Sequence, residues 1–407
     1  MNSPAAELRV DGVRLLSRLD ELAARSAPGP GVTRLAYSAE DEAARALVGS
    51  WLREAGLQVR IDTAGNVLGT LPGSAGLPRP LLTGSHLDTV VMGGTLDGAY
   101  GVVAAIEVAE SLRGRLRHDL VVAAWSNEEG ARSTPGMVGS RAAAGTLEPA
   151  WLDSPDDDGV PLRARLGADV LTARMGPVEA YLELHVEQGP VLDTAGTVVG
   201  AVEGITGQLV GAIDVRSTAN HAGTTPMALR QDALAAAAEI VLAIERLALD
   251  GAVRVATCGH IRVAPNVRNT IPGRVLLSVD LRDMSDARSE AAWSALVAVV
   301  AAVDDRRGTR SQLKVVSRVA AVDCDPCLVA LVERAAAARG LGALRLPSGA
   351  GHDAQVLSML GPVGMVFVPS VAGVSHSPGE RTESAHLIAG AQVLLDVVAA
   401  VDDQPRC

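Results

Sequence analysis

Short continuous apolar runs alternate with longer helical segments over much of the chain. Four such runs cover residues 80–85, 120–126, 180–184 and 364–369. Between them a helix is predicted over 99–112, and Ser38 and Asp41 have capping-box spacing that opens a helix at about Glu40. Continuous apolar strands interleaved with helices are typical of an α/β domain, with a buried, mostly parallel sheet and helices on both faces.

The middle of the chain has a different order of elements. Strands are predicted over 208–216, 253–263, 273–283 and 314–319, and helices over 232–247 and 289–303. This β-α-β-β-α-β order predicts a ferredoxin-like α+β module. Because 407 residues fit two cores better than one, we expect two domains. The α/β domain would contain residues 1–207 and 323–407, and the inserted module residues 208–322.

Polar side chains that can bind metal follow each of the four apolar runs. They are His86 and Asp88 after the first run, Glu128 and Glu129 after the second, His185 after the third and His376 in the loop after the fourth. A further candidate, Asp97, lies in a glycine-rich turn. Sites in open α/β sheets lie beyond the carboxyl ends of the strands, so we expect these groups to converge. Each is commonplace alone, but a buried cluster of carboxylates without a cation would be costly. The set therefore predicts a metal of the zinc, manganese or nickel type.

The chemistry of a two-metal centre assigns roles within this set. Two neighbouring cations need a bridging carboxylate, and Asp97 is the candidate. A water shared by two cations loses a proton near neutral pH, and an unligated carboxylate beside it can act as the general base. Of the adjacent Glu128 and Glu129, one can bind metal while the other faces the water. Asp88 is placed to orient the His86 imidazole.

Composition narrows the possible partners and compartment. The net charge of −11 argues against a nucleic acid or an anionic membrane as partner. Residues 1–20 lack the apolar centre of a signal peptide, and the longest apolar run, near residues 295–303, is too short to span a bilayer. We expect a cytoplasmic protein. Cys324 and Cys327 have the CxxC form of a redox or zinc pair, but a second CxxC is absent, which favours two ordinary residues at a helix start.

Taken together, the motifs resemble those of the M20 metallopeptidase-like amidohydrolases, specifically their hydantoinase/carbamoylase branch. The resemblance runs from about residue 40 to the C-terminus. It rests on Gly84–Thr89, Gly94–Gly98, Asn127–Gly130, Glu183–Gly189, Asn220–Pro226, Pro265–Asn269, Asp280–Arg282, Ser348–Ala354 and Ser375–Pro378.

For the metal centre, the resemblance implies two divalent ions per subunit, with zinc preferred and manganese, nickel or cobalt as alternatives. One ion would be held by His86, Asp97 and His185, and the other by Asp97, Glu129 and His376, with Glu128 as the base. The inserted module would be a lid that also joins two subunits into a homodimer.

For the substrate, a small carboxylate, the resemblance implies that His221 and Asn269 polarise the scissile carbonyl, with His221 reaching in from the partner subunit. Arg282 would clamp the substrate carboxylate, to which a guanidinium fork is well fitted, and Gln188 would lie nearby. His352 is either a neighbour of the metal ligands or a substrate contact.

We therefore expect hydrolysis of a ureido (N-carbamoyl) C–N bond, with release of ammonia and carbon dioxide. N-carbamoyl-L-amino acids and allantoate are the leading substrates, and both carry a carboxylate. One alternative is an N-acyl amino acid amidase or dipeptidase on the same scaffold. Another, of a different class, is a non-catalytic binding protein on a hydrolase fold, which would require a lost ligand or base.

Overall fold

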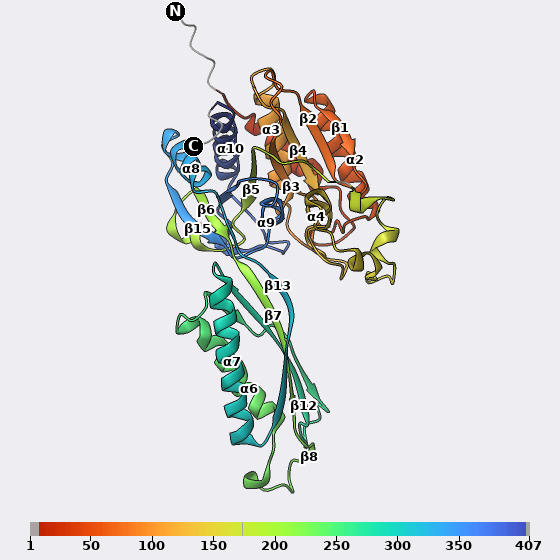
Figure 1. Ribbon diagram of the computed structural model, residues 1–407, viewed down its shortest axis with the longest axis vertical. Coiled ribbons are helices and arrows are strands. Elements are labelled where there is room, and N and C mark those ends of the chain that lie inside the picture. Colours follow the sequence, from red (N-terminus) through yellow and green to blue (C-terminus); the bar gives the residue numbers. More distant parts are fainter. Residues whose placement is uncertain (1–7, 173, 404–407) are drawn as a thin grey trace, which may run out of the picture. The chain divides into compact units, whose positions relative to one another are not determined.

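The computed structural model describes residues 8–172 and 174–403, and the chain forms two compact units (Figure 1). The first unit contains Met1–Glu203 and Cys324–Cys407, and the second contains Gly204–Asp323.

The larger sheet has the strand order β1-β2-β4-β3-β5-β16-β6-β14, with β15 paired to β6. Its strands are β1 (Gln58–Ile61), β2 (Val67–Leu71), β3 (Leu81–His86), β4 (Leu120–Trp125), β5 (Ala180–Val186), β6 (Val199–Ile205), β14 (Val322–Asp323), β15 (Ala343–Ser348) and β16 (Val363–Val368). The central strands β4, β3, β5 and β16 are parallel, and every residue in them is buried. This confirms the predicted mostly parallel sheet, whose four carboxyl ends meet at one edge.

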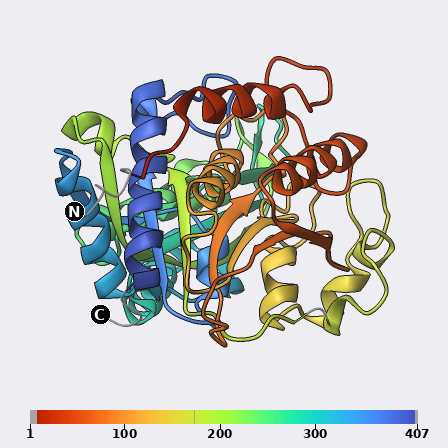
Figure 2. The same cartoon turned by 90° about the horizontal axis from the view of Figure 1, so that it is seen from above.

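Helices cover both faces of this sheet. They are α1 (Gly12–Ala23), α2 (Ala39–Glu54), α3 (Ala99–Ser111), α4 (Val138–Ala144), α5 (Val191–Ala195), α8 (Pro326–Ala338), α9 (Asp353–Leu357) and α10 (Ser384–Asp403). Gly390 of α10 lies against Val368, whereas His352, which precedes α9, stacks on Phe367. Because neighbouring residues of a strand point to opposite faces, α10 and α9 lie on opposite sides of the sheet. Figure 2 shows α1, α3 and α10 next to one another, in red, orange and dark blue.

By length and composition alone, α10 is apolar enough to cross a membrane, but half of its apolar stretch is buried inside the protein. Contacts with α3, α8, β5 and β16 account for its apolar sequence. Near its end, the buried Asp402 carboxylate accepts hydrogen bonds from the backbone N–H groups of Arg117 and His118, each 2.8 Å long.

The second unit is an antiparallel sheet with the order β10-β12-β7-β13, with β9 also paired to β12. Its elements are β7 (Gly207–Arg216), β8 (Asn220–His221), α6 (Ala233–Leu249), β9 (Val255–Thr257), β10 (Ile261–Ala264), β11 (Thr270–Ile271), β12 (Arg274–Asp283), α7 (Asp286–Arg307) and β13 (Arg310–Val319). The long strands and the two helices confirm the predicted ferredoxin-like order. Gly211 on β7 leaves room for the Trp293 indole of α7, where an added Cβ would lie 2.3 Å from the ring.

One predicted element of this unit was wrong. The single strand expected over residues 253–263 is two strands, β9 and β10. Thr257 pairs with Asp280 of β12, and Ile261 pairs with Leu277 of the same strand. Four residue steps from Thr257 to Ile261 therefore lie opposite only three steps on β12. The extra residue makes a β-bulge, a feature that an apolar pattern does not encode.

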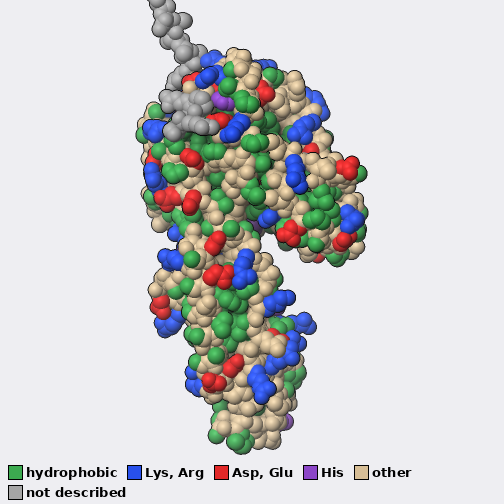
Figure 3. Space-filling view, viewed as in Figure 1, with side chains coloured by type: hydrophobic (Ala, Val, Ile, Leu, Met, Phe, Trp, Pro, Cys, Tyr) green, Lys and Arg blue, Asp and Glu red, His purple; other side chains and the backbone are tan. Residues whose placement is uncertain are grey.

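Short 3-10 helices complete the described chain: η1 (Pro149–Asp153), η2 (Leu162–Ala164), η3 (Val170–Thr172), η4 (Met227–Leu229) and η5 (Val371–Gly373). On the face drawn in Figure 3, arginine and acidic side chains are interspersed over each unit.

Candidate active site

The structure brings the five predicted metal ligands together at the carboxyl edge of the larger sheet. His86 ends β3, His185 is the penultimate residue of β5, and Asp97 directly precedes the N-cap of α3. Glu129 lies in the loop after β4, and His376 in the loop after β16. They form two groups, His86–Asp97–His185 and Asp97–Glu129–His376, and within each group the candidate ligand atoms lie within 4.8 Å of one another.

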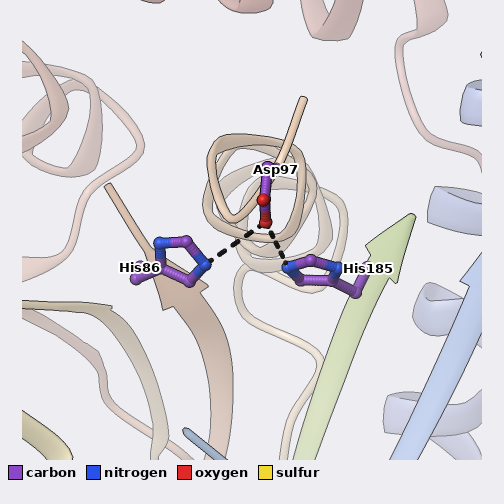
Figure 4. A group of neighbouring side chains, drawn as sticks. All are labelled: His86, Asp97 and His185. Carbon is purple, nitrogen blue, oxygen red and sulfur yellow. Dashed lines mark ion pairs between the residues drawn. The ribbon is translucent and has the colours of Figure 1, made fainter. Parts of the chain in front are cut away.

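Asp97 belongs to both groups and faces each with a different oxygen. Its Oδ1 lies 3.1 Å from His185 Nε2 and 3.5 Å from His86 Nε2, as Figure 4 shows. Its Oδ2 lies 2.9 Å from His376 Nε2, which is itself 3.5 Å from Glu129 Oε1. This is the arrangement of a carboxylate that can bridge two cations.

Backbone carbonyls fix the tautomers of two imidazoles. His86 Nδ1 lies 2.9 Å from the Asp88 carbonyl oxygen, and His185 Nδ1 lies 2.9 Å from the Val186 carbonyl oxygen. A carbonyl can only accept, so Nδ1 donates in each ring, and in the neutral ring Nε2 keeps a lone pair. The Gly98 N–H donates to His185 Nε2 at 3.1 Å, which agrees with that assignment. Both Nε2 atoms are thus prepared as metal ligands.

Gly98 is required for the close approach of this turn to the first imidazole. Its φ is 64°, and an added Cβ would lie 2.4 Å from the His86 ring. A side chain would therefore be strained in the backbone and would also displace a ligand.

The Asp88 side chain does not have the predicted role of orienting His86. Its two carboxylate oxygens accept hydrogen bonds from the backbone N–H groups of Glu128 (3.1 Å) and Glu129 (3.2 Å). Its nearest carboxylate oxygen to His86 Nδ1 is 4.0 Å away, and the backbone carbonyl of the same residue takes that position. The side chain points instead toward the loop after the neighbouring strand β4, where it orients both glutamates.

Burial and crowding shift the acids of the site in different directions. Burial raises the pKa of Glu128 well above its usual range, and the neighbouring Glu129 adds to the shift. Burial, aided by Asp97, raises the pKa of Glu129 to about 7. Burial also raises the pKa of Asp97, but its hydrogen bonds with the three histidines outweigh burial and hold that pKa well below the usual range. The hydrogen bond to Asp97 raises the pKa of His376 to about 9.

Two predicted contacts lie beside the ligands. The Gln188 amide donates to Asp97 Oδ2 at 3.0 Å, and its Nε2 lies 3.2 Å from His376 Nε2. His352 is buried and packs behind His185, with 4.6 Å between ring centroids, and its Nε2 lies 2.9 Å from Ser348 Oγ. The structure therefore places His352 as a neighbour of a ligand, one of the two roles considered.

In the second unit, the pairing of β8 with β11 brings His221 next to Asn269. His221 Nδ1 accepts hydrogen bonds from the backbone N–H groups of Gly223 (3.0 Å) and Thr224 (3.2 Å). The neutral ring must then carry its proton on Nε2. This exposed imidazole can donate a hydrogen bond to an oxyanion.

Arg282 lies at the opposite end of the same unit. Two residues separate β11 from β12, which begins at Arg274, and Arg282 lies eight residue steps further along this extended strand. That separation is about 26 Å at ~3.3 Å per residue. Arg282 donates to both oxygens of Asp280, at 3.1 and 3.0 Å, which keeps its guanidinium fork ordered.

The two cysteines of the CxxC sequence lie apart from this centre. Cys324 is buried, and Cys327 lies in the first turn of α8, which Asp325 caps. Neither belongs to a group of metal-binding side chains in residues 8–172 and 174–403. Cys327 takes part in a disulfide, so the interpretation as two ordinary residues holds for Cys324 alone.

Comparison with known proteins identifies the family to which this chain belongs. The model of peptidase family M20/M25/M40 matches residues 82–400. The chain belongs to this family.

Relatives of this M20 chain extend over nearly its whole length. It is 41% identical over 401 residues to an N-carbamoyl-L-amino acid amidohydrolase of Geobacillus stearothermophilus, covering 96% of this chain and 98% of that protein. It is 37% identical to an allantoate amidohydrolase of Bacillus subtilis (strain 168), covering 90% and 92% of the two chains. The solved structure of a hydantoinase/carbamoylase family amidase from Burkholderia multivorans matches it with a TM-score of 0.92 at 37% identity, covering 98% of this chain and 100% of that one.

We expect metal binding by this M20 chain to release protons and to strengthen as pH rises from 6 to 9. A cation binds deprotonated His376 and Glu129, whose pKa values in the metal-free protein are about 9 and about 7. An ion bound at Asp97–Glu129–His376 should therefore release about two protons at pH 6 and about one at pH 8 from these two side chains. An ion at the first group should release further protons, because the pKa values of His86 and His185 are also raised. Calorimetric titration in buffers of different ionisation enthalpy measures this number. An affinity that stays constant from pH 6 to 8.5 would contradict these assignments.

Proposed function

We propose that this chain hydrolyses the carbamoyl C–N bond of a small ureido acid, either an N-carbamoyl-L-amino acid or allantoate, with release of ammonia and carbon dioxide. The observation that carries the proposal is the doubly shared Asp97 carboxylate, with three imidazoles and two glutamates around it. The amidohydrolases to which the chain is related over nine-tenths or more of its length support the same reaction.

The side chains fit two divalent ions, for which we propose zinc, with manganese, nickel or cobalt as alternatives. Imidazole nitrogen and carboxylate oxygen are donors that such ions accept. The Glu129 Oε1 atom is buried without a hydrogen bond, which is costly unless a cation satisfies it. When bound, the ions would acidify a water and stabilise negative charge on the substrate oxygen.

In the proposed reaction, side chains of this protein transfer the protons and hold the substrate. Glu128 takes the proton of the attacking water and then passes it to the leaving nitrogen. The His221 Nε2–H donates to the oxyanion, and Asn269 beside it helps to polarise the carbonyl. Arg282 binds the substrate carboxylate and Gln188 lies close to it. The first products are the amine and a carbamate, which breaks down to ammonia and carbon dioxide.

The separation of these groups along β12 supports a homodimer. Arg274 and Arg282 lie about 26 Å apart along β12, and His221 pairs with β11 just before the Arg274 end of that strand. One small substrate could not reach both His221 and Arg282 of the same copy. We therefore propose that the second copy supplies His221 and Asn269, and that residues 208–322 serve as lid and dimerisation domain beside a catalytic domain of residues 1–207 and 323–407. We also propose a cytoplasmic location.

The substrate class is tested by measuring ammonia release from metal-loaded protein. We expect turnover of N-carbamoyl-L-amino acids or allantoate, and a matched panel of N-acetyl amino acids and dipeptides should turn over at least about tenfold more slowly, because the site is proposed for a ureido group. A preference for the N-acetyl compounds or dipeptides would favour the amidase or dipeptidase. Inactivity on every compound would favour a binding protein.

Replacement of Glu128 tests the assigned base. Glu128→Gln should lower kcat by about 10²- to 10⁴-fold while leaving the metal content unchanged, because the amide keeps the shape but cannot take a proton. The adjacent Glu129→Gln is the matched control and should lose metal, as measured by elemental analysis. Full activity in Glu128→Gln would remove Glu128 from the mechanism.

Replacement of Arg282 tests the carboxylate clamp. Arg282→Lys should raise KM by roughly tenfold or more with little change in kcat, because a lysine cannot offer two parallel hydrogen bonds. Asp280→Asn, which loosens the ordering partner of Arg282, should have a smaller effect. An unchanged KM in Arg282→Lys, measured on a substrate with a free carboxylate, would show that Arg282 does not bind the substrate carboxylate.

A further inference from the structure

A single buried carboxylate, that of Glu380, joins the loop of Asp97 to the loop of His376. Its Oε1 accepts hydrogen bonds from the backbone N–H groups of Leu96 (2.8 Å) and Asp97 (3.1 Å). Its Oε2 accepts a hydrogen bond of 2.8 Å from the hydroxyl of Ser375, the residue before His376. The residue is only 7% exposed, so these bonds are shielded from water.

The turn before Asp97 is built around this carboxylate. A Cβ added at Gly94 would lie 2.1 Å from Glu380 Oε1 and 2.4 Å from Glu380 Cβ. A glycine at position 94 is therefore needed for the Glu380 side chain to reach the backbone of Leu96 and Asp97. The space left by Gly94 is filled by the Glu380 side chain, which comes from the loop of His376.

His376 depends on such a link more than the other ligands do. His86 and His185 lie on buried strands and are held by backbone carbonyls, and the loop of Glu129 is held by Asp88. In contrast, His376 has a positive φ of 53° in a loop, and its side chain is 47% exposed.

Hydrogen bonds close the loop of His376 at its base. The Val371 N–H donates to the Arg381 carbonyl at 2.9 Å, and the Thr382 hydroxyl donates to the Pro369 carbonyl at 2.7 Å. Between these closures, Glu380 on the returning limb is the side chain that ties Ser375 to the Asp97 turn.

We propose that Glu380 is a positioning residue that sets the spacing between Asp97 and His376, and through it the affinity of the second group, Asp97–Glu129–His376, for its ion. This inference rests on the proposed two-metal function. It assigns to Glu380 a selective effect. Loss of the carboxylate weakens the second group far more than the first, because Glu380 bonds to the first group only through the backbone of the shared Asp97, whereas in the second group it also holds Ser375 beside His376.

The test is a two-step titration of metal-stripped, full-length protein with Zn²⁺ against a competing chelator, repeated with Co²⁺ to follow its visible absorption. Wild type should bind two ions. Glu380→Met, which keeps the volume but removes both acceptors, should weaken one step by about 10- to 100-fold and the other by less than about threefold. Glu380→Gln should bind nearly as wild type, because its Oε1 can accept from both N–H groups and its Nε2 can donate to Ser375 Oγ.

Two further variants change the residues that contact Glu380 and leave Glu380 itself unchanged. Ser375→Ala removes only the Oε2 bond and should weaken the same step by a smaller factor, even if Glu380→Met does not fold. Gly94→Ala keeps the Glu380 carboxylate in the protein, but the added methyl group pushes it away from the Asp97 turn. This variant should therefore show the same selective weakening of one binding step.

Asp402→Leu is the matched control, because Asp402 is also a buried carboxylate that accepts two backbone N–H groups, but it lies outside both metal groups. It should lower the melting temperature and leave both steps unchanged. Two wild-type-like steps in Glu380→Met, or an equal loss at both steps, would overturn the role of Glu380. A wild-type chain that binds no second ion would instead overturn the two-metal function itself.

Discussion

The structure depends on one carboxylate that is shared by two sets of ligands. Asp97 presents one oxygen to His86 and His185 and the other to His376. Its acidic neighbours Glu128 and Glu129 are also largely shielded from water. Like charges this close repel strongly where water is excluded, so the cluster is stable only with protons or cations among them. The surrounding elements therefore hold the acids together against their own repulsion.

The fold does this mainly with its backbone. The carbonyls of Asp88 and Val186 orient two imidazoles, and the Asp88 carboxylate holds two backbone amides of the glutamate loop. Such contacts are anchored by strand ends in a buried sheet, which are among the stiffest parts of a domain. The two imidazoles carried by strands need little further support. The loops of Glu129 and His376 are held by side chains instead, that of Glu129 by Asp88 and, on our proposal, that of His376 by Glu380.

The sequence allowed the sheet edge and its ligands to be predicted, but not the contacts that hold them. The continuous apolar run before His185 indicates a buried parallel strand, and parallel strands place their carboxyl ends together. Whether the side chain or the carbonyl of Asp88 meets His86 depends on the turn conformation, which composition does not determine. Glu380 bonds to the amide of Asp97 across 283 positions of sequence, so no local pattern connects them.

The division of groups between the two units also explains how one scaffold can serve several reactions. The candidate ligands and Glu128 all belong to the first unit, whereas His221, Asn269 and Arg282 belong to the second. On the proposed function, the first set would activate water whatever acyl group is attacked, and the second set would contact the substrate and present its carbonyl. A family named for peptidases can include amidohydrolases on this proposal, because most of the groups proposed to contact the substrate lie in a different unit from the shared carboxylate.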